Sequence, residues 1–340
     1  MPHEPLAALD AAVYYLDREL APAAKVRAFQ RARAVVERVG PDEIRRRAAD
    51  GTLTELDGIG PSTARVIAEA LAGVDDGYLA ELERRSRVPV GEGAGILAAL
   101  RGDCHCHTTW SDGGADIATM ARTARDLGHD WLVITDHSAR LTVAHGLDEE
   151  RLAAQLDEIA SLNAELAPFR LLTGMEVDIL ADGTLDLADE MLARLDLVVA
   201  SAHSKLAMPR DEMTRRLVRA VASPHVDVLG HCTNRKLTGR GRPPSDFDAE
   251  IVFAACARFD TAVEINCRPE RQDPPEELLD LALEWGCKVS IDTDAHAPGQ
   301  LEWQAYGADK AARCGVDLDD IVDTWDADTV CAWAASHAAG

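Results

Sequence analysis

Trp131-Leu-Val-Ile-Thr-Asp-His137 is a short apolar run that ends in an aspartate and a histidine, and it is one of seven such runs between residues 101 and 296. Nearly all of the other six also end in a histidine, aspartate or glutamate: Asp103-Cys-His-Cys-His107, Leu171-Leu-Thr-Gly-Met-Glu176, Leu197-Val-Val-Ala-Ser-Ala-His203, Val226-Asp-Val-Leu-Gly-His231, Ala262-Val-Glu-Ile-Asn266 and Val289-Ser-Ile-Asp-Thr-Asp-Ala-His296. Such runs are typical of buried strands. Because a parallel barrel brings all its strand ends to one rim, we predict that these side chains meet there in a cup that binds several metal ions.

The length of 340 residues predicts two domains, one large and one small, and the hydrophobic fraction of 47% is ample for a buried core. No apolar stretch reaches the roughly 18–20 residues that a membrane helix needs. The first residues, Met-Pro-His-Glu-Pro, lack the basic and apolar segments of a secretion signal. We therefore expect a cytoplasmic protein that does not contact membranes.

The eight cysteines show no paired C-x-x-C spacing, so we expect reduced thiols that pack as small hydrophobic side chains. The net charge of −24 argues against strong, non-specific nucleic-acid binding, which depends on Lys and Arg. The first hundred residues hold 13 basic and 16 acidic side chains, so nearly all of the net charge lies in residues 101–340. We infer that the two parts have different functions and that any nucleic acid is bound locally.

Residues 6–85 read as helices over 6–20, 23–39, 41–50, 62–72 and 78–85. Between the third and fourth, Gly58-Ile59-Gly60 followed by Pro61-Ser62 predicts a tight hairpin, because glycine permits positive φ and close approach of another backbone. Free amides at the start of the following helix then form a seat for phosphate. The pattern favours a helix-hairpin-helix that binds a nucleic-acid backbone, whereas the alternative is an ordinary turn between helices.

A basic run that includes Lys25 and Arg27 precedes this hairpin, with Phe29 among the cations. It is either a solvated helix face or a surface that holds a DNA end by charge and stacking. Together with Leu56-Asp-Gly-Ile-Gly60, this run makes the region resemble the small N-terminal domain of family X DNA polymerases. The resemblance implies binding of DNA ends or gaps, but Val66 occupies the position of the lysine that gives some members lyase activity.

The chain divides on this basis into a helix-hairpin-helix domain at 1–87, a glycine-rich linker at 88–100 and a barrel at 101–340. Nothing the size of a polymerase palm and fingers lies between the two domains. We therefore do not expect nucleotide polymerisation.

His105 and His107 alternate along one strand, so both rings are expected on one face, with Cys104 and Cys106 on the other. Two such nitrogens can share one metal ion at about 2.0–2.1 Å. Seven further candidate ligands follow near the other strand ends: Asp112, His137, Glu176, His203, His231, Asp294 and His296.

Residues 101–335 resemble the polymerase-and-histidinol-phosphatase (PHP) superfamily, through His105-x-His107, Ser111-Asp112-Gly113, Thr135-Asp-His137-Ser, Glu176-Val-Asp-Ile, Ser201-Ala-His203-Ser, Pro224-His-Val-Asp-Val-Leu-Gly-His231, Glu264-Ile-Asn266 and Asp292-Thr-Asp294-Ala-His296. The resemblance is to the PHP domain at the C-terminus of bacterial family X polymerases, and it implies a distorted (β/α)7 barrel with three metal ions.

The resemblance also implies how the ligands divide among the ions. The first ion takes His105, His107, Glu176 and Asp294, which are the expected catalytic group; the second shares Glu176 and adds His203 and His231; the third takes Asp112, His137 and His296. Mixed imidazole and carboxylate ligands suit zinc, manganese or iron better than magnesium or calcium.

Cations near this rim are expected to bind substrate phosphate, because guanidinium groups match phosphate oxygens. The alternative for each is a solvated loop. The candidates are Arg235 and Arg240, then Arg268 and Arg271, with Asn266 and His145 as weaker ones.

Two carboxylate-bridged ions can clamp the attacking and leaving oxygens of a phosphate ester, which predicts phosphoester hydrolysis. The leading hypothesis is a nuclease or 3′-end processing enzyme acting on DNA. One alternative is a phosphomonoesterase on a small metabolite such as histidinol phosphate or a nucleotide, which the acidic surface favours. The other is a non-catalytic DNA-binding scaffold, which the complete set of ligands disfavours.

Overall fold

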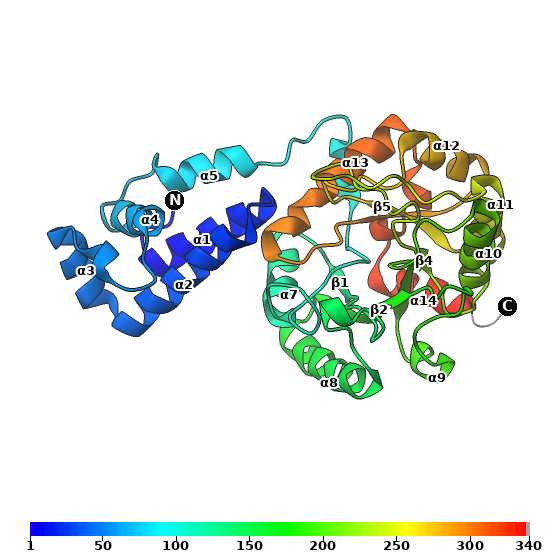
Figure 1. Cartoon of the computed structure of the whole chain (residues 1–340), viewed down its shortest axis with the longest axis horizontal. Coiled ribbons are helices and arrows are strands. Elements are labelled where there is room, and N and C mark those ends of the chain that lie inside the picture. The colour runs from blue at the N-terminus through cyan, green and yellow to red at the C-terminus, as the bar shows by residue number, and fades with distance from the viewer. Residues whose placement is uncertain (338–340) are drawn as a thin grey trace. The chain divides into compact units, whose positions relative to one another are not determined.

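A computed structural model describes residues 1–337, which form two compact units (Figure 1). The first unit contains Met1–Val88 and Pro298–Gln300. The second contains Pro89–Ala297 and the described residues from Leu301 onward. Each unit has its own apolar core.

The first unit is all helical: α1 Pro5–Arg18, α2 Ala23–Val39, α3 Pro41–Asp50, a short 3-10 turn η1 Leu53–Glu55, α4 Pro61–Leu71 and α5 Tyr78–Ser86. The sequence predicts these five helices because their limits carry local signals. Proline occupies the first position of α1, α3 and α4, where its missing N–H costs no hydrogen bond. Gly51 ends α3 in the left-handed conformation, with φ of +69°.

Phe29 is not available to stack on a nucleic acid, contrary to one reading of the basic run. Its side chain is buried in the core of the first unit with Leu9, Leu16 and Ile67. Its ring lies parallel to that of Tyr78, with 6.3 Å between the centroids. The helical spacing of the run places this residue on the core-facing side of α2.

The second unit is built on a sheet of six parallel strands in sequence order, and helices surround these strands in Figure 1. The strands are β1 Trp131–Ile134, β2 Arg170–Asp178, β3 Leu197–Ser201, β4 Val228–Leu229, β5 Ala262–Asn266 and β6 Val289–Asp292. The helices of this unit are α6 Ala94–Ala99, α7 Ile117–Asp126, α8 Glu149–Leu166, α9 Asp189–Leu192, α10 Arg210–Val221, α11 Ala249–Phe259, α12 Glu276–Glu284, α13 Gln304–Arg313 and α14 Ala327–His337. Short 3-10 turns η2 Thr142–Ala144, η4 Leu318–Asp320 and η5 Val322–Thr324 also belong to this unit, while η3 Pro298–Trp303 is divided between the two units after Gln300.

The first apolar run, residues 103–107, does not form the regular seventh strand that the sequence predicts. Its backbone still bridges the two edges of the sheet: the Asp103 carbonyl accepts from Val133 at 3.0 Å, and the His107 amide donates to Ala295 at 2.7 Å. The amides between are bonded to side chains instead, since Cys104 donates to the Asp292 carboxylate at 2.9 Å. The segment therefore closes a distorted barrel without a regular ladder.

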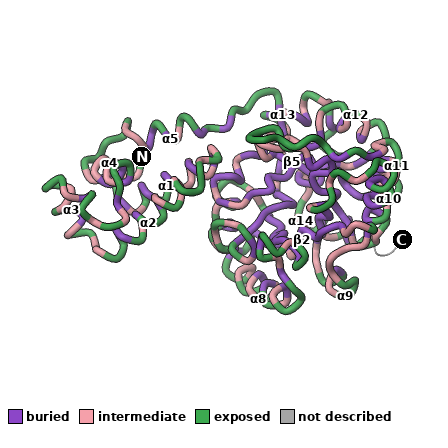
Figure 2. The backbone as a smooth tube through the Cα atoms, in the orientation of Figure 1, coloured by how far each residue is buried: buried purple, intermediate pink, exposed green. Residues whose placement is uncertain are grey.

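Side chains alternate along each strand, so the barrel strands present two sets of side chains on opposite faces of the sheet. The strands of this unit are largely buried, as Figure 2 shows. One set, such as Met175 and Val198, packs in the largest cluster with helix residues such as Met213 of α10. The opposite set includes Leu172 and Val199, which pack with α14 residues near the amino ends of the strands. Glu176 and His203 have the same strand parity as this second set, so the candidate ligands lie on the inner face at the carboxyl ends.

The segment expected to be a linker belongs in part to the barrel unit. Residues 94–99 form α6, which packs against α13. Ahead of this helix, the amides of Gly91 and Gly93 donate to the Asp309 carboxylate at 3.0 and 2.8 Å. The two units meet in sequence at Val88 and Pro89.

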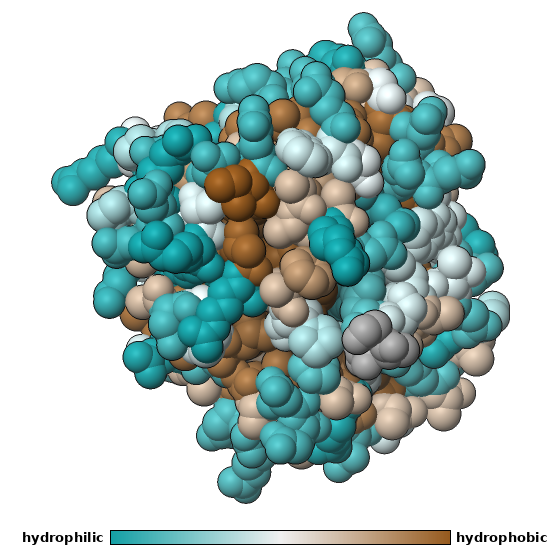
Figure 3. Space-filling model, turned by 90° about the vertical axis from the view of Figure 1, so that its right-hand side faces the viewer, coloured by the Kyte–Doolittle hydropathy of each residue, from teal (hydrophilic) through white to brown (hydrophobic). Residues whose placement is uncertain are grey.

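One face of the protein is mainly polar. On the face in Figure 3, hydrophilic side chains cover most of the area, with one narrower strip of apolar side chains between them. All eight cysteines are free thiols, as expected. Among the described residues, no helix combines the length and the low charge that crossing a bilayer requires.

Candidate metal centre

The nine expected metal ligands gather at the carboxyl ends of the strands. Glu176 is on β2, while His203 and His231 each follow the last residue of their strand, β3 or β4, by two positions. Asp294 and His296 follow β6, His137 follows β1, and Asp112 precedes α7. Parallel topology therefore brings together residues that are up to 191 positions apart, as the spacing of the runs predicts.

His105, His107, Glu176 and Asp294 form the first group. The Nε2 atoms of His105 and His107 are 3.2 Å apart, and they lie 3.5 and 3.6 Å from Oε2 of Glu176. His107 Nε2 is 3.4 Å from Oδ1 of Asp294. Ligands at about 2.0–2.1 Å around a tetrahedral ion are separated by about 3.3 Å, so these four atoms have the spacing of a coordination shell.

A second group forms around the other oxygen of the same carboxylate. Oε1 of Glu176 lies 3.2 Å from Nε2 of His203 and 2.9 Å from Nε2 of His231. The two oxygens of Glu176 thus face two different groups. This arrangement is suited to a carboxylate that bridges two metal ions.

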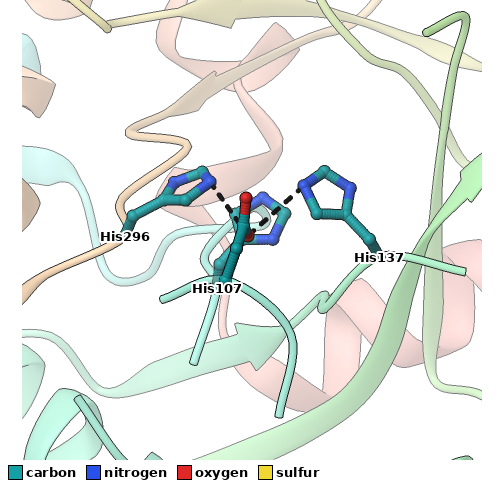
Figure 4. A group of neighbouring side chains, drawn as sticks. His107, His137 and His296 are labelled. Atoms are coloured by element: carbon teal, nitrogen blue, oxygen red, sulfur yellow. Dashed lines mark ion pairs between the residues drawn. The ribbon is translucent and has the colours of Figure 1, made fainter. Parts of the chain in front are cut away.

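Asp112, His137 and His296 form the third group. Oδ1 of Asp112 is 3.6 Å from Nε2 of His137 and 3.4 Å from Nε2 of His296, along the dashed lines in Figure 4. The ring of His107 lies between the other two imidazoles, with centroids 4.3 Å from His137 and 4.1 Å from His296. A nitrogen of His107 is close enough to join this group as well as the first.

An unpaired polar atom indicates that these groups fit metal ions. Nε2 of His203 is buried and has no hydrogen-bond partner, although it lies 3.2 Å from Oε1 of Glu176. Burying such an atom without a partner is costly, and a metal ion would satisfy it. The imidazole and carboxylate donors match zinc, manganese or iron in kind.

The charges of the site influence one another strongly. Burial alone would raise the pKa of Glu176, but His203, His105 and His137 hold it well below its usual range. Burial, aided by the positive charge of Arg271, lowers the pKa of His231 to about 4. A carboxylate that stays ionised beside a neutral imidazole is the combination that binds a divalent cation.

Glu264 is a functional residue to which sequence reasoning gave no role. Its Oε1 accepts from Nδ1 of His105 at 2.6 Å, and its Oε2 accepts from the backbone amide of His231 and from Nδ2 of Asn266. A carboxylate behind a ligand histidine fixes the ring and makes it a better donor to the metal. The sequence signal that could indicate this role is a glutamate inside the otherwise apolar run Ala262-Val-Glu-Ile.

Asp136 supports the segment that carries Asp112. This buried carboxylate accepts from the Thr108 amide at 2.8 Å and the Thr108 hydroxyl at 2.6 Å. It also accepts from the Ser111 hydroxyl at 2.5 Å and from Gln155 of α8 at 2.7 Å. The turn before Asp112 is therefore held in place from within the barrel.

A cavity of about 280 Å³ opens above the centre. Of the predicted phosphate-binding residues, Arg235, Arg268 and Arg271 line it. Arg240 does not line it, and Lys236 and Arg242 of the same loop do. His145 lines a separate groove with Trp110, and Asn266 is buried behind the centre, where it donates to Asp294 at 3.1 Å.

The three arginines differ in how many of their donors are already bonded. Arg268 donates to Glu270 at 2.9 Å and to the Asp294 carbonyl at 2.9 Å. Arg235 donates to the backbone carbonyl of Arg271 at 3.0 Å and to that of Gln272. Arg271 has an Nη1 group without a partner. Its Nε lies 3.5 Å from Oδ2 of Asp294, so of these three arginines Arg271 is the one that keeps a donor without a bond.

The predicted DNA-binding residues lie on the first unit. Gly58 has φ of +92° and Gly60 precedes the first residue of α4, so the glycines predicted to form a hairpin lie in the tight turn that leads into this helix. The amide of Gly60 is already bonded to the Thr63 hydroxyl at 2.9 Å, and Ile59 is buried in the core. Ser62, Lys25 and Arg27 are at least partly accessible, with the Lys25 ammonium 5.8 Å from the centre of the Tyr78 ring.

Fold and site together define a metal-dependent phosphoesterase, and comparison with known proteins identifies the kind. Residues 103–266 match the family model described as the PHP domain. The chain thus contains a PHP domain with the side chains of a metal-dependent phosphoesterase.

The most informative relative is the DNA polymerase/3′-5′ exonuclease PolX of Bacillus subtilis, which is 40% identical over 227 residues. The matched region covers 67% of this chain but only 40% of the Bacillus protein. A probable phosphatase of Thermoanaerobacter sp. is 29% identical over 206 residues, covering 57% of this chain and 78% of that protein.

Among solved structures, histidinol phosphate phosphatase of Lactococcus lactis, complexed with zinc, L-histidinol and phosphate, gives a TM-score of 0.48 at 18% identity. The similarity covers 64% of this chain and 95% of that one.

Proposed function

We propose that this protein removes nucleotides from DNA 3′ ends, as a 3′-5′ exonuclease or 3′-end processing enzyme with three divalent ions. The observation that carries the proposal is the two-sided Glu176 carboxylate, whose oxygens face two separate histidine groups beneath a cavity lined by arginines. Similarity to a Bacillus protein named for a 3′-5′ exonuclease supports DNA as the substrate.

The residues around the cavity have separable roles in this reaction. Divalent ions bound here would polarise the phosphate ester and activate a water molecule. Glu176 holds two groups of ligands at a fixed spacing, and Asp112 with His137 and His296 provides the third. Arg271, which lines the cavity, would bind a non-bridging oxygen of the phosphate.

The helical unit would hold the DNA near the reacting end. Ser62 is exposed in the first turn of α4, where helix amides and the helix dipole favour phosphate. The exposed Arg27 and the partly accessible Lys25 of α2 add positive charge to this unit. Contacts of this kind bind the backbone without reading bases.

A phosphomonoesterase acting on a small metabolite is the second candidate function. The small cavity of about 280 Å³ and the net charge of −24 favour it, as do the relatives named as probable phosphatases. The helical unit has no evident use in such a reaction. A non-catalytic DNA scaffold is disfavoured because all nine ligand positions hold competent side chains.

The decisive assay compares end-labelled single-stranded, recessed and gapped DNA with histidinol phosphate and nucleotides, each in the presence of manganese. We expect shortening of DNA from the 3′ end, with a much lower kcat/KM on the metabolites. Efficient release of phosphate from a metabolite, with DNA left intact, would reject the proposal in favour of the phosphatase.

A variant of the helical unit tests its part in the reaction. Ser62→Asp places a negative charge where it favours the start of α4 but repels phosphate, so the unit should stay folded. We expect KM for DNA to rise about tenfold, with p-nitrophenyl phosphate turnover unchanged. Ser62→Ala is the matched control, and equal KM values for the two variants would contradict DNA binding at this turn.

A further inference from the structure

The rim of the metal cavity is asymmetric in chemical character. Twelve of its fifteen lining residues are ionisable, among them Arg235, Arg242 and Arg271. The three apolar ones, Leu141, Val143 and Ala144, all come from the single turn at η2. One wall of the cavity is therefore apolar, while the remainder is charged.

Val143 is the most exposed large apolar side chain among the described residues, at 87% exposed. A single exposed valine is ordinary on a protein surface. This one differs because it lines the mouth of a cavity whose other walls are charged. Covering its side chain by a ligand would add about 1.5 kcal/mol of binding, or about tenfold in affinity.

The turn that presents Val143 is held firmly at its base. Leu141 donates to the Ser138 carbonyl at 3.1 Å, and Leu147 donates to the His137 carbonyl at 2.7 Å. Arg151 of α8 donates to the carbonyls of His145 at 2.6 Å and Gly146 at 3.1 Å. The apolar wall is thus fixed relative to the ligand His137 and presented to the cavity before any substrate arrives.

We propose that the turn at Leu141–Ala144 is a subsite for the nucleobase of the 3′-terminal nucleotide. This rests on the proposed function and deepens it. A terminal nucleotide has a charged phosphate and a flat, uncharged base, which match the cationic and apolar walls of one cavity. Contact with the face of a base tolerates every sequence, as an end-trimming enzyme requires. The volume of about 280 Å³ is small for a ligand site and suits one terminal nucleotide.

The test compares two 5′-labelled single-stranded oligonucleotides, one ending in a 3′ thymidine nucleotide and the other in a 3′ tetrahydrofuran abasic nucleotide. For the wild-type protein with manganese, we expect KM for the abasic end to be about tenfold higher. In Val143→Ser the ratio of the two KM values should fall to about two. Val143→Leu, which retains the apolar surface, should keep the ratio near ten.

Val90→Ser is the matched control, since it makes the same change at an exposed valine outside the cavity, and it should keep the wild-type ratio. A wild-type ratio near one, or an unchanged ratio in Val143→Ser, would overturn the subsite while leaving exonuclease activity in place. If neither oligonucleotide is shortened but a phosphorylated metabolite is hydrolysed, the proposed function itself fails.

Discussion

Glu264→Gln is the substitution that most directly examines how the barrel prepares its metal centre. The glutamine has nearly the same shape, so it fits the buried position between β5 and the centre. It removes the negative charge that faces Nδ1 of His105 across 2.6 Å. Its amide nitrogen also places a donor where the carboxylate accepts from the His231 amide or from the Asn266 side chain.

The expected loss follows from these contacts. Removing a carboxylate that orients a ligand histidine costs roughly 10–100-fold in metal affinity or activity, or about 1.4–2.7 kcal/mol. Glu264 faces the His105 ring across a short, charge-assisted hydrogen bond, so we expect a value near the upper end. Because His105 belongs to the first group, the weakened ion should be the one held by His105, His107 and Asp294.

Metal content and affinity are the appropriate measurements. Titration of the metal-free protein with manganese by calorimetry should show one binding step weakened by about 100-fold, with kcat on phosphate esters reduced in parallel. Glu277→Gln on the exposed side of α12 is the matched control and should bind all its ions normally. Wild-type affinity and wild-type kcat in Glu264→Gln would refute the inference that this carboxylate tunes His105.

Two further predictions concern the cavity cation and the response to acid. Arg271→Met should raise KM for phosphate esters about tenfold or more with a smaller change in kcat, because it removes charge-assisted hydrogen bonds to substrate; Arg240→Met, outside the cavity, should leave KM unchanged, and equal effects of the two would contradict the role of Arg271. Burial lowers the pKa of His129 to about 4 from 6.5, so the unfolded chain binds more protons between these values and stability falls as the pH drops through them. Urea unfolding should therefore show that the free energy of unfolding falls between pH 7 and pH 5 by about 2 kcal/mol less in His129→Gln than in the wild type. Equal decreases in the two proteins would exclude His129 as the cause.

Much of the fold follows from the sequence because its signals are local. The helices at 23–39 and 41–50 have the predicted bounds. Pro22 precedes the first helix, Gly40 separates the two, and Pro41 begins the second. Six of the seven apolar runs contain strands, because each run is short, continuous and bounded by polar residues. Ligands at strand ends could be predicted because parallel topology brings all such ends to one rim.

The features that the sequence does not predict correctly depend on contacts between residues far apart in the chain. The segment 103–107 is irregular because Asp292, almost two hundred positions away, binds the Cys104 amide. The same irregularity separates Cys104 and Cys106, which pack in different clusters. Within the loop after His231, an antiparallel bridge between Lys236 and Arg242 turns these two residues to the cavity, and Arg240 lies outside it.

The barrel interior shows how one sheet can provide both stability and a reactive centre. Inward residues near the amino ends of the strands, such as Leu172 and Val199, are apolar and pack against Trp333 of α14. Four residues further along the chain from each, the inward positions are Glu176, on β2, and His203, two residues after the end of β3. Ionisable groups in such a place are costly to bury without a cation, so the apolar half must supply the stability that holds their ligand atoms 2.9 to 3.6 Å apart. It follows that changes in the lower half should reduce metal affinity through the spacing of the ligands, even where they touch none of them.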